Sequence, residues 1–412
     1  MHILFIMFLL STIFSISDAQ TRLQNTAPLD MQGDIGMQMV AGIGDYLQKL
    51  TSEIAAKRSA DWKKLAANPA NWKQAVVAKR EKLEELLGMV DPLAKPEMHF
   101  DSWLSANGRP DTVCAMGVGY TVHSVRWNVT DGLTGCGLLL LPAKRPVGIV
   151  IALPDCDWSP EEYCGLSPGV NPNQHLPRIL AQNGFVVLVP RLIDRKDNFS
   201  GIPGVRMTNQ PHREFVYRAA FLMGRTIIAY ECSKVLTAID WLKQNYPGLK
   251  IGVSGCGEGG LVALYSSALD TRINSTLVSG YIQPRESLWQ EPIYRNVFGL
   301  LNEFGDAELL SMIGPRRVVV EAGGYPEIAG PPAPHDGRSG AAPGALSRPN
   351  PESLVAEVER GRRLASSNGG DVIFVTDGDG PNSLRAVSAF ASAIDDQDPM
   401  APRRMKIFAE NL

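Results

Sequence analysis

Short apolar runs alternate with longer amphipathic stretches through most of this chain. The runs carry β-branched and aromatic residues between turn residues, which is typical of buried strands. We expect strands at Tyr120–Val129, Gly137–Leu141, Gly148–Leu153, Phe185–Val189, Ile251–Ser254, Thr276–Ile282, Arg317–Glu321 and Val372–Thr376. Helical spacing predicts helices at Arg213–Gln244, Gly260–Ala268 and Pro351–Ser366. Such alternation predicts an α/β fold: a mostly parallel sheet with helices on both faces, and ligands at the carboxyl ends of its strands.

The N-terminal part has a different pattern. Ile3–Ile16 is apolar but short for a membrane span, and small residues precede Gln20, so we expect a signal peptide cleaved after Ala19 and a secreted or periplasmic protein. Tyr46–Leu87 has helical spacing interrupted at Asn68-Pro69. The predicted organisation is a signal peptide (1–19), a linker (20–45), an N-terminal helical extension (46–114), an α/β domain (115–395) and a C-terminal tail (396–412).

Composition narrows the class of protein. The 412 residues include 40 Lys and Arg against 43 Asp and Glu, with 44% hydrophobic residues and a formal net charge of −3. Disordered chains are less apolar and nucleic-acid-binding proteins are usually basic, so we expect a globular protein without a nucleic-acid partner. No later segment is long and apolar enough to predict membrane insertion. The six cysteines permit disulfides, but the sequence does not select a pairing.

The strongest local signal is the segment Ile251–Gly260, with the sequence IGVSGCGEGG. It predicts a buried strand, a tight glycine turn and a helix, which is the architecture of a nucleophile elbow. An elbow of pattern GxSxG holds a serine in a strained backbone conformation that faces the substrate. Here Gly257 takes the place of that serine. Glycine adopts such conformations at little cost, so the turn can keep its shape without the nucleophile.

These residues give the chain a resemblance to a known family. Gly224–Leu242, the elbow and Phe304–Arg316 resemble α/β-hydrolases of the dienelactone hydrolase and acetyl xylan esterase kind, over about residues 115–395. The resemblance implies an α/β-hydrolase fold and the hydrolysis of esters, often acetyl groups on plant polysaccharides. It also implies a catalytic serine, an acid and a histidine, in that order along the chain.

The triad is incomplete when it is placed on this sequence. The serine is replaced by Gly257, and the acid position offers Glu321 or Glu327. The histidine should follow Val372–Thr376, but the sequence there is Asp-Gly-Asp-Gly-Pro-Asn. The remote His335, in the Pro- and Gly-rich loop Gly323–Pro351, is the remaining candidate base; its alternative is a solvated loop histidine. An ordinary Ser-His-Asp mechanism is therefore not expected.

Other polar residues lie at predicted strand ends, and we expect several of them to converge on one rim of the sheet. A carboxylate pair can activate water, and arginines can bind a carboxylate or sugar hydroxyls. The candidate catalytic residues are Glu258, Asp155, Asp157 and His212, and the candidate substrate-binding residues are Arg191, Arg195 and Arg213. Each also has a structural alternative, as a cap, an ion-pair partner or a helix opening. We expect no cofactor and no metal site, because no metal-binding motif is present and the glycine turn lacks an N-terminal βαβ context.

Two functional hypotheses remain open at this point. The first is an exported hydrolase that cleaves a small-molecule or saccharide ester through a non-standard site, with Glu258 and a partner handling protons. The second is a non-catalytic hydrolase-fold module that binds a saccharide or a protein. The absent serine and histidine motivate the second hypothesis, whereas the polar cluster motivates the first.

Overall fold

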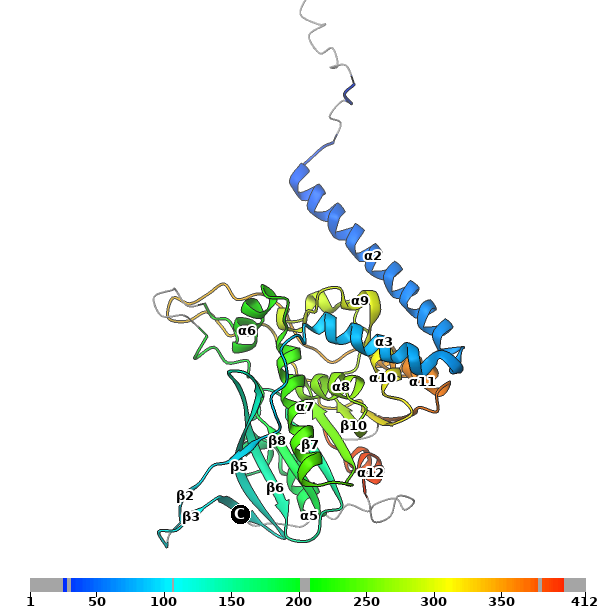
Figure 1. The fold of residues 1–412 in the computed structure, drawn as a ribbon. Helices are drawn as coiled ribbons and strands as arrows, with labels where there is room; N and C mark the ends of the chain where they lie inside the picture. The colour runs from blue at the N-terminus through cyan, green and yellow to red at the C-terminus, as the bar shows by residue number, and fades with distance from the viewer. Residues whose placement is uncertain (1–24, 28–30, 106, 201–207, 377–379, 396–412) are drawn as a thin grey trace, which may run out of the picture. The chain divides into compact units, whose positions relative to one another are not determined.

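The computed structural model describes residues 25–27, 31–105, 107–200, 208–376 and 380–395 (Figure 1). The predicted signal peptide and C-terminal tail therefore lie outside the described residues. The chain divides into two units, Met1–Ser52 and Glu53–Leu412. Helix α2 (Ile35–Ala66) begins within the segment expected to be a linker. Among the described helices, none combines the length and the apolar character needed to cross a bilayer.

A ten-stranded sheet organises the second unit (Figure 1). Its order is β1-β5-β6-β8-β7-β9-β10-β11-β12, and β4 also pairs with β5. The strands from β8 to β12 in this order are parallel, whereas β6 runs antiparallel to β5 and β8. The strands are β1 (Met98–Phe100), β4 (Val113–Gly117), β5 (Tyr120–Thr130), β6 (Leu133–Pro142), β7 (Gly148–Leu153), β8 (Phe185–Pro190), β9 (Ile251–Cys256), β10 (Ile273–Ser279), β11 (Arg317–Glu321) and β12 (Asp371–Val375); β2 (Trp103–Leu104) and β3 (Pro110–Asp111) form a separate pair.

Helices cover both faces of this sheet. The side chains of β7 alternate: Ile149 and Ile151 join one apolar cluster, and Val150 joins the other. The first cluster contains α3, α7, α8, α10 and α11, and the second contains α5 and α12. The helices are α3 (Pro69–Leu87), α4 (Pro160–Tyr163), α5 (Leu176–Gln182), α6 (His212–Phe221), α7 (Ile227–Asn245), α8 (Glu258–Leu269), α9 (Leu300–Glu303), α10 (Asp306–Ile313), α11 (Pro351–Ser366) and α12 (Leu384–Ser392), with 3-10 turns η1 (Pro172–Gln174), η2 (Leu288–Gln290) and η3 (Ile293–Arg295).

Helix α3 is fixed to the α/β core by a half-buried arginine, Arg80. The Arg80 guanidinium donates to the carbonyl oxygens of Ala268 and Met312, at 3.0 Å each. These carbonyls lie at the carboxyl ends of α8 and α10, where helices have unsatisfied acceptors and a cation is favourable. Strand β1, which precedes residue 115, and strand β4, which begins at Val113, both pair with β5. The predicted extension therefore contributes to the main sheet as well as to its helical layer.

Two sequence expectations need correction. The single helix predicted at Arg213–Gln244 is two helices, α6 and α7, because Gly224 adopts a left-handed φ of 65° between them. The six cysteines, all within the described residues, are free thiols. Strand β11 and helix α11 have the predicted bounds.

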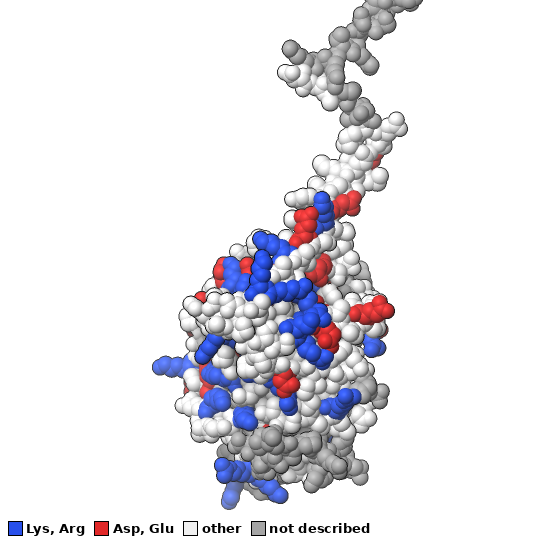
Figure 2. Space-filling view, turned by 90° about the vertical axis from the view of Figure 1, so that its right-hand side faces the viewer, with Lys and Arg blue, Asp and Glu red and all other residues white. Residues whose placement is uncertain are grey.

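On the face shown in Figure 2, Lys and Arg side chains lie among Asp and Glu side chains.

Candidate functional site

The segment after β9 has the geometry of a nucleophile elbow. Strand β9 ends at Cys256, Gly257 has φ 54° and ψ −120°, and α8 begins at Glu258. Gly255 and Gly259 are required by close backbone contact, because a Cβ atom on Gly255 would lie 2.0 Å from the Gly259 oxygen. The glycine pattern of the sequence therefore reflects the approach of strand and helix that an elbow needs.

The carboxylate of Asp155 occupies the place that a side chain at position 257 would take. A Cβ atom built on Gly257 would lie 2.0 Å from Asp155 Oδ2. The same oxygen accepts a hydrogen bond of 3.0 Å from the backbone N–H of Glu258. In an elbow, the amide after the nucleophile contributes to the oxyanion hole. Here that amide already has a buried, intramolecular anionic partner.

Arg195 holds this carboxylate in place. It follows β8, and its three nitrogen atoms all bind neighbours from other elements. Nη1 lies 2.7 Å from both Asp155 Oδ1 and Asp157 Oδ2. Nη2 donates to Glu258 Oε1 at 3.1 Å, and Nε donates to the Tyr294 hydroxyl at 2.9 Å. Asp155, Asp157 and Glu258 are thus brought together around one buried guanidinium, as the sequence analysis predicted for strand ends.

Glu258 is fully buried among three arginines. Besides Arg195, its carboxylate accepts from Arg295 Nε at 2.7 Å and lies 3.5 Å from Arg213 Nη2. Burial raises the pKa of Glu258, but Arg295, Arg213 and Arg195 more than offset burial and lower the pKa to about 2. A carboxylate of this pKa stays ionised at neutral pH and is a weak base. The predicted proton-handling role therefore has no support in this geometry.

Sequence reasoning missed Arg295 and its neighbours. The loop after β10 supplies Arg295, Glu291 and Arg285, which form a second buried group of charges. Glu291 binds Arg295 Nη1 at 2.8 Å and Arg285 Nη1 at 3.1 Å, and Arg285 Nη2 lies 2.8 Å from Asp306. Four charged residues lie among the 18 of segment 281–298, a proportion close to the 20% of the whole chain, and they follow no helical or strand period. The sequence therefore carries no signal that these side chains are buried.

A carboxylate is present at the predicted acid position, but it binds backbone amides and no histidine. Glu321, at the end of β11, accepts from Ser279 Oγ at 2.5 Å and from the backbone N–H groups of Asn382 and Ser383 at 2.7 and 2.9 Å. Asn382 lies in the loop after β12, where the family places a histidine. Glu321 thus fixes the backbone of this loop. The other acid candidate, Glu327, is exposed.

His212 and Arg191 make contacts outside the cluster. His212 Nδ1 lies 2.5 Å from Asp194 Oδ1, and its Nε2 accepts from the Phe199 N–H at 2.8 Å. Both ring nitrogens therefore have partners. Arg191 forms an exposed ion pair of 2.6 Å with Glu161. Arg213 is fully buried against Glu258, and all three nitrogens of Arg195 have partners, so neither offers the open substrate contact that was predicted; Arg191 is exposed but makes its contact outside the cluster.

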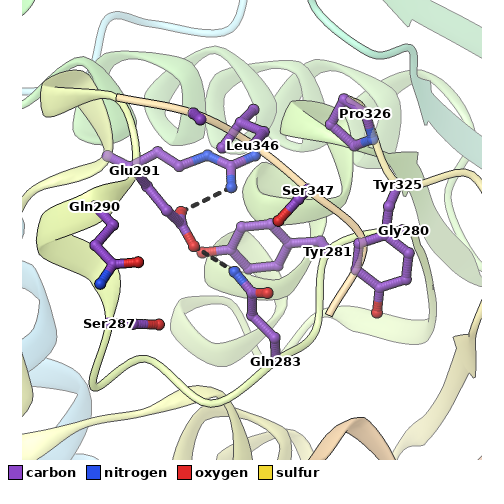
Figure 3. A pocket seen from close by; sticks show the side chains of 12 residues that line it. Gly280, Tyr281, Gln283, Ser287, Gln290, Glu291, Tyr325, Pro326, Leu346 and Ser347 are labelled. Atoms are coloured by element: carbon purple, nitrogen blue, oxygen red, sulfur yellow. Dashed lines mark hydrogen bonds and ion pairs between the residues drawn. The ribbon is translucent and has the colours of Figure 1, made fainter. Parts of the chain in front are cut away.

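Two pockets open near the cluster. The first has a volume of about 200 Å³ and is mainly apolar; Asp157 and Arg195 lie at one side, and residues of the 328–344 loop lie at the other. The second has a volume of about 90 Å³ and lies beyond β10 and β11, with Tyr281, Gln283 and Tyr325 in its wall (Figure 3). Ligand atoms of Asp155, Cys156 and Asp157 lie within 4.8 Å of one another, but Arg195 already supplies the positive charge between the two carboxylates.

His335 anchors the loop beside the first pocket and does not contact the elbow. Its Nε2 lies 2.7 Å from Asp197 Oδ2, and its Nδ1 lies 3.0 Å from Asp336 Oδ2. The adjacent Arg338 donates to the carbonyl oxygen of Thr208 at 3.0 Å. His335 is thus a half-exposed ion-pair partner, and for its predicted role as a remote base it has no partner at the elbow among the residues described.

This anchor should weaken as the pH rises. Hydrogen bonds to Asp336 and Asp197 raise the pKa of His335 above its ordinary value of 6.5. A raised pKa gives stability that is fully present below pH 6.5 and is lost as the pH rises through the folded value. We expect the protection factor of the Arg338 amide, which is the exchange rate corrected for intrinsic base catalysis at the same pH, to fall above that value; NMR measures it together with the His335 titration. His335→Gln should abolish the pH dependence of this protection factor, and an unchanged dependence in this variant would contradict the assignment.

Comparison with known proteins was made for the sequence and for the fold. No protein-family model and no curated protein matches the chain. One similar solved structure is assigned as an acetyl xylan esterase from Bacteroides fragilis, with 14% identity, a TM-score of 0.53, and coverage of 75% of this chain and 76% of that chain. Another is a methylesterase, with 16% identity, a TM-score of 0.53, and coverage of 84% and 68%. At these identities, the likeness concerns the fold.

Proposed function

Because the chain has the α/β-hydrolase fold, we propose that it is a hydrolase-fold protein that binds a ligand at the carboxyl edge of its sheet without cleaving it through a serine triad. The observation that carries the proposal is the position of Asp155. Its carboxylate fills the nucleophile place beside Gly257 and accepts the N–H of Glu258. The elbow therefore has no nucleophile, and the amide that would stabilise the oxyanion is already bound to Asp155.

The remaining triad positions support the same proposal. Glu321 is retained, but it binds the amides of Asn382 and Ser383 instead of orienting an imidazole. A triad needs a base within hydrogen-bond reach of its nucleophile and an acid that orients the base. The apolar leader Ile3–Ile16 supports the further proposal that the ligand is met outside the cytoplasm.

Ester hydrolysis through a non-standard site is the second candidate. One observation favours it: the Asp157 side chain is 38% exposed and borders the 200 Å³ pocket, so a carboxylate faces a space that could admit a substrate and water. Against it, both oxygens of Asp157 already have partners in Arg195: Oδ2 lies 2.7 Å from Nη1, and Oδ1 accepts from the backbone N–H at 3.1 Å. The esterase names of the two similar structures make carbohydrate esters the first compounds to test.

We expect the purified protein to hydrolyse neither p-nitrophenyl acetate nor acetylated xylan above the rate in buffer. The measurements are p-nitrophenolate absorbance and released acetate, with an active esterase as the positive control. Turnover by the wild type would contradict the proposal. Its loss in Asp157→Asn, with unchanged thermal unfolding, would then favour the second candidate, because this substitution removes the exposed carboxylate and keeps the Arg195–Asp155 pair.

A further inference from the structure

The first half of helix α2 contains no buried side chain. The helix spans Ile35–Ala66, and its buried residues, Arg58, Trp62 and Ala66, all lie near its carboxyl end. A helix in a protein gains most of its stability by packing an apolar face against a partner. Among the residues that the structure describes, no such partner buries a side chain of the part of α2 before Ser52, which belongs to the first unit of the chain.

One apolar stripe runs along this part of the helix. The α2 stripe consists of Met39, Val40, Ile43, Tyr46, Leu47 and Leu50. Its first three members recur after seven residues as its last three, which is the heptad spacing of two helices that share a seam. Five of the six residues are 52% to 69% exposed, and Leu50 is half-buried. Apolar surface that is both continuous and exposed marks a site of interaction.

Two glycines in the same segment indicate that another backbone comes close. Gly42 and Gly44 weaken an isolated helix, because glycine loses the most conformational entropy when it is ordered. A Cβ atom on either residue would meet no atom within 4 Å, so the packing of this chain does not require glycine there. A helix without Cβ atoms at these positions allows a second backbone to approach closely. The glycines therefore cost stability in the single chain and fit a helix that packs against another.

The charges of the segment argue against other partners for the stripe. Asp45 and Lys49 are the only charged residues in 35–50, and their charges cancel. Both lie at heptad positions that point away from the seam. Helices that bind a lipid surface carry many Lys and Arg side chains on their polar face, and a charged protein partner is matched by a surface of opposite charge. Two copies of this neutral segment, in contrast, meet without net repulsion.

The area of the stripe sets the strength of such a contact. Burying one apolar side chain removes roughly 60–120 Å² from water, so six side chains from each of two copies bury roughly 700–1,400 Å² in total. Stable specific interfaces bury about 1,200–2,000 Å². Two heptads are also fewer than the about three or four of a coiled coil that is stable by itself. The stripe therefore suits a reversible pair with a micromolar dissociation constant.

We propose that the α2 stripe pairs with the same stripe of a second copy, so that the protein forms a reversible dimer. The pair is isologous, because a twofold axis brings the same six side chains from both copies together. It gives the first half of α2 the packed face that the single chain lacks. The proposal is independent of ligand binding at the sheet edge, because the stripe shares no residue with the elbow or with either pocket.

Sedimentation velocity of the full chain tests this pairing over about a hundredfold range of micromolar concentration. We expect the mass to rise from one copy to two as the concentration increases. Far-ultraviolet circular dichroism should show more helix in the dimer, because pairing supplies the missing contacts. A mass of one copy throughout the range would overturn the proposal.

A matched pair of variants tests whether the stripe is the interface. Leu47→Lys puts like charges on both sides of the seam and should weaken the dimer at least about tenfold. Gln48→Lys adds the same charge at the next residue, which points away from the seam, and should leave the dissociation constant unchanged. Both positions are exposed in the single chain, so neither substitution disturbs a buried contact. A dimer of unchanged strength in Leu47→Lys, or equal weakening in both variants, would place the association on another surface and overturn the assignment.

Flotation with neutral phosphatidylcholine vesicles distinguishes a lipid surface from a second copy. We expect the vesicles to leave the dissociation constant of the wild-type dimer unchanged. Binding of a single copy to the vesicles that is lost in Leu47→Lys and kept in Gln48→Lys would show that the stripe meets lipid, and it would overturn the proposal.

Discussion

Glu258→Gln should lose about 3–5 kcal/mol of unfolding free energy, because it leaves Arg195, Arg213 and Arg295 buried without their shared carboxylate. The linkage between pKa and stability gives a similar magnitude. The difference between the ordinary value of 4.5 and the folded value of about 2 is worth roughly 3 kcal/mol. A lowered pKa gives stability that is present above pH 4.5 and is lost as the pH falls toward 2. The measurement is the urea midpoint at pH 7 and at pH 3.

Two further variants make this result interpretable. Glu327→Gln changes an exposed carboxylate and should leave the midpoint unchanged. Arg295→Met removes one of the three cations and should cost less than Glu258→Gln, because Glu258 keeps Arg195 and Arg213. A wild-type midpoint in Glu258→Gln would contradict a structural role for this carboxylate. If the wild type did hydrolyse an ester, loss of turnover in Glu258→Gln would identify a catalytic residue only where the stability of the variant was retained.

Gly257→Ser should restore no esterase activity and should destabilise the protein. The new Cβ atom would meet Asp155 Oδ2 at 2.0 Å, so either the carboxylate or the turn has to move. A non-glycine residue at φ 54° and ψ −120° adds a conformational cost of about 1–3 kcal/mol. The new hydroxyl would also lack a histidine, because the position after β12 holds Asn382. We expect p-nitrophenyl acetate hydrolysis at the rate in buffer and a lower urea midpoint.

Gly257→Ala separates the clash from the hydroxyl chemistry. It should be destabilised to a similar extent as Gly257→Ser, since both add a Cβ atom at the same place. A burst of p-nitrophenolate in Gly257→Ser but not in Gly257→Ala would show that a base and an oxyanion donor are available. That outcome would contradict the arrangement in which Asp155 holds the Glu258 amide.

The fold was predictable because its elements carry local signals. The turn at Gly257 follows from glycines at fixed spacing. Strand Arg317–Glu321 and helix Pro351–Ser366 have the bounds that their residue patterns predict. The predicted convergence of Asp155 and Glu258 also follows from strand order, because parallel strands end at one edge. Roughly the first three turns of α2, before Tyr46, were not predicted, since Ile35–Asp45 is rich in Gly and Met and has no polar face of regular spacing.

The chemistry of the site was less predictable than its location. Arg295 contacts Glu258 across 37 positions from an irregular loop, and such a contact has no sequence period. The spacing also could not show that Arg195 would use all its nitrogens on buried partners, namely three carboxylates and the Tyr294 hydroxyl, or that His212 would face Asp194. Both facts decide function. They depend on which side chains meet in three dimensions. A list of candidates taken from strand ends therefore includes residues whose hydrogen-bond donors and acceptors are already bound within the protein.

The position of the Asp155 carboxylate affects how carboxylic acids in solution can bind at the elbow. Its side chain ends in the same group as acetate, and it meets the Glu258 amide at 3.0 Å while Arg195 holds it from the other side. A tethered group of this kind acts at an effective concentration of millimolar or more. A free acetate or other small carboxylic acid would have to displace it to reach the amide. The Asp155 carboxylate therefore competes with free carboxylic acids, including those that ester cleavage releases, for the Glu258 N–H.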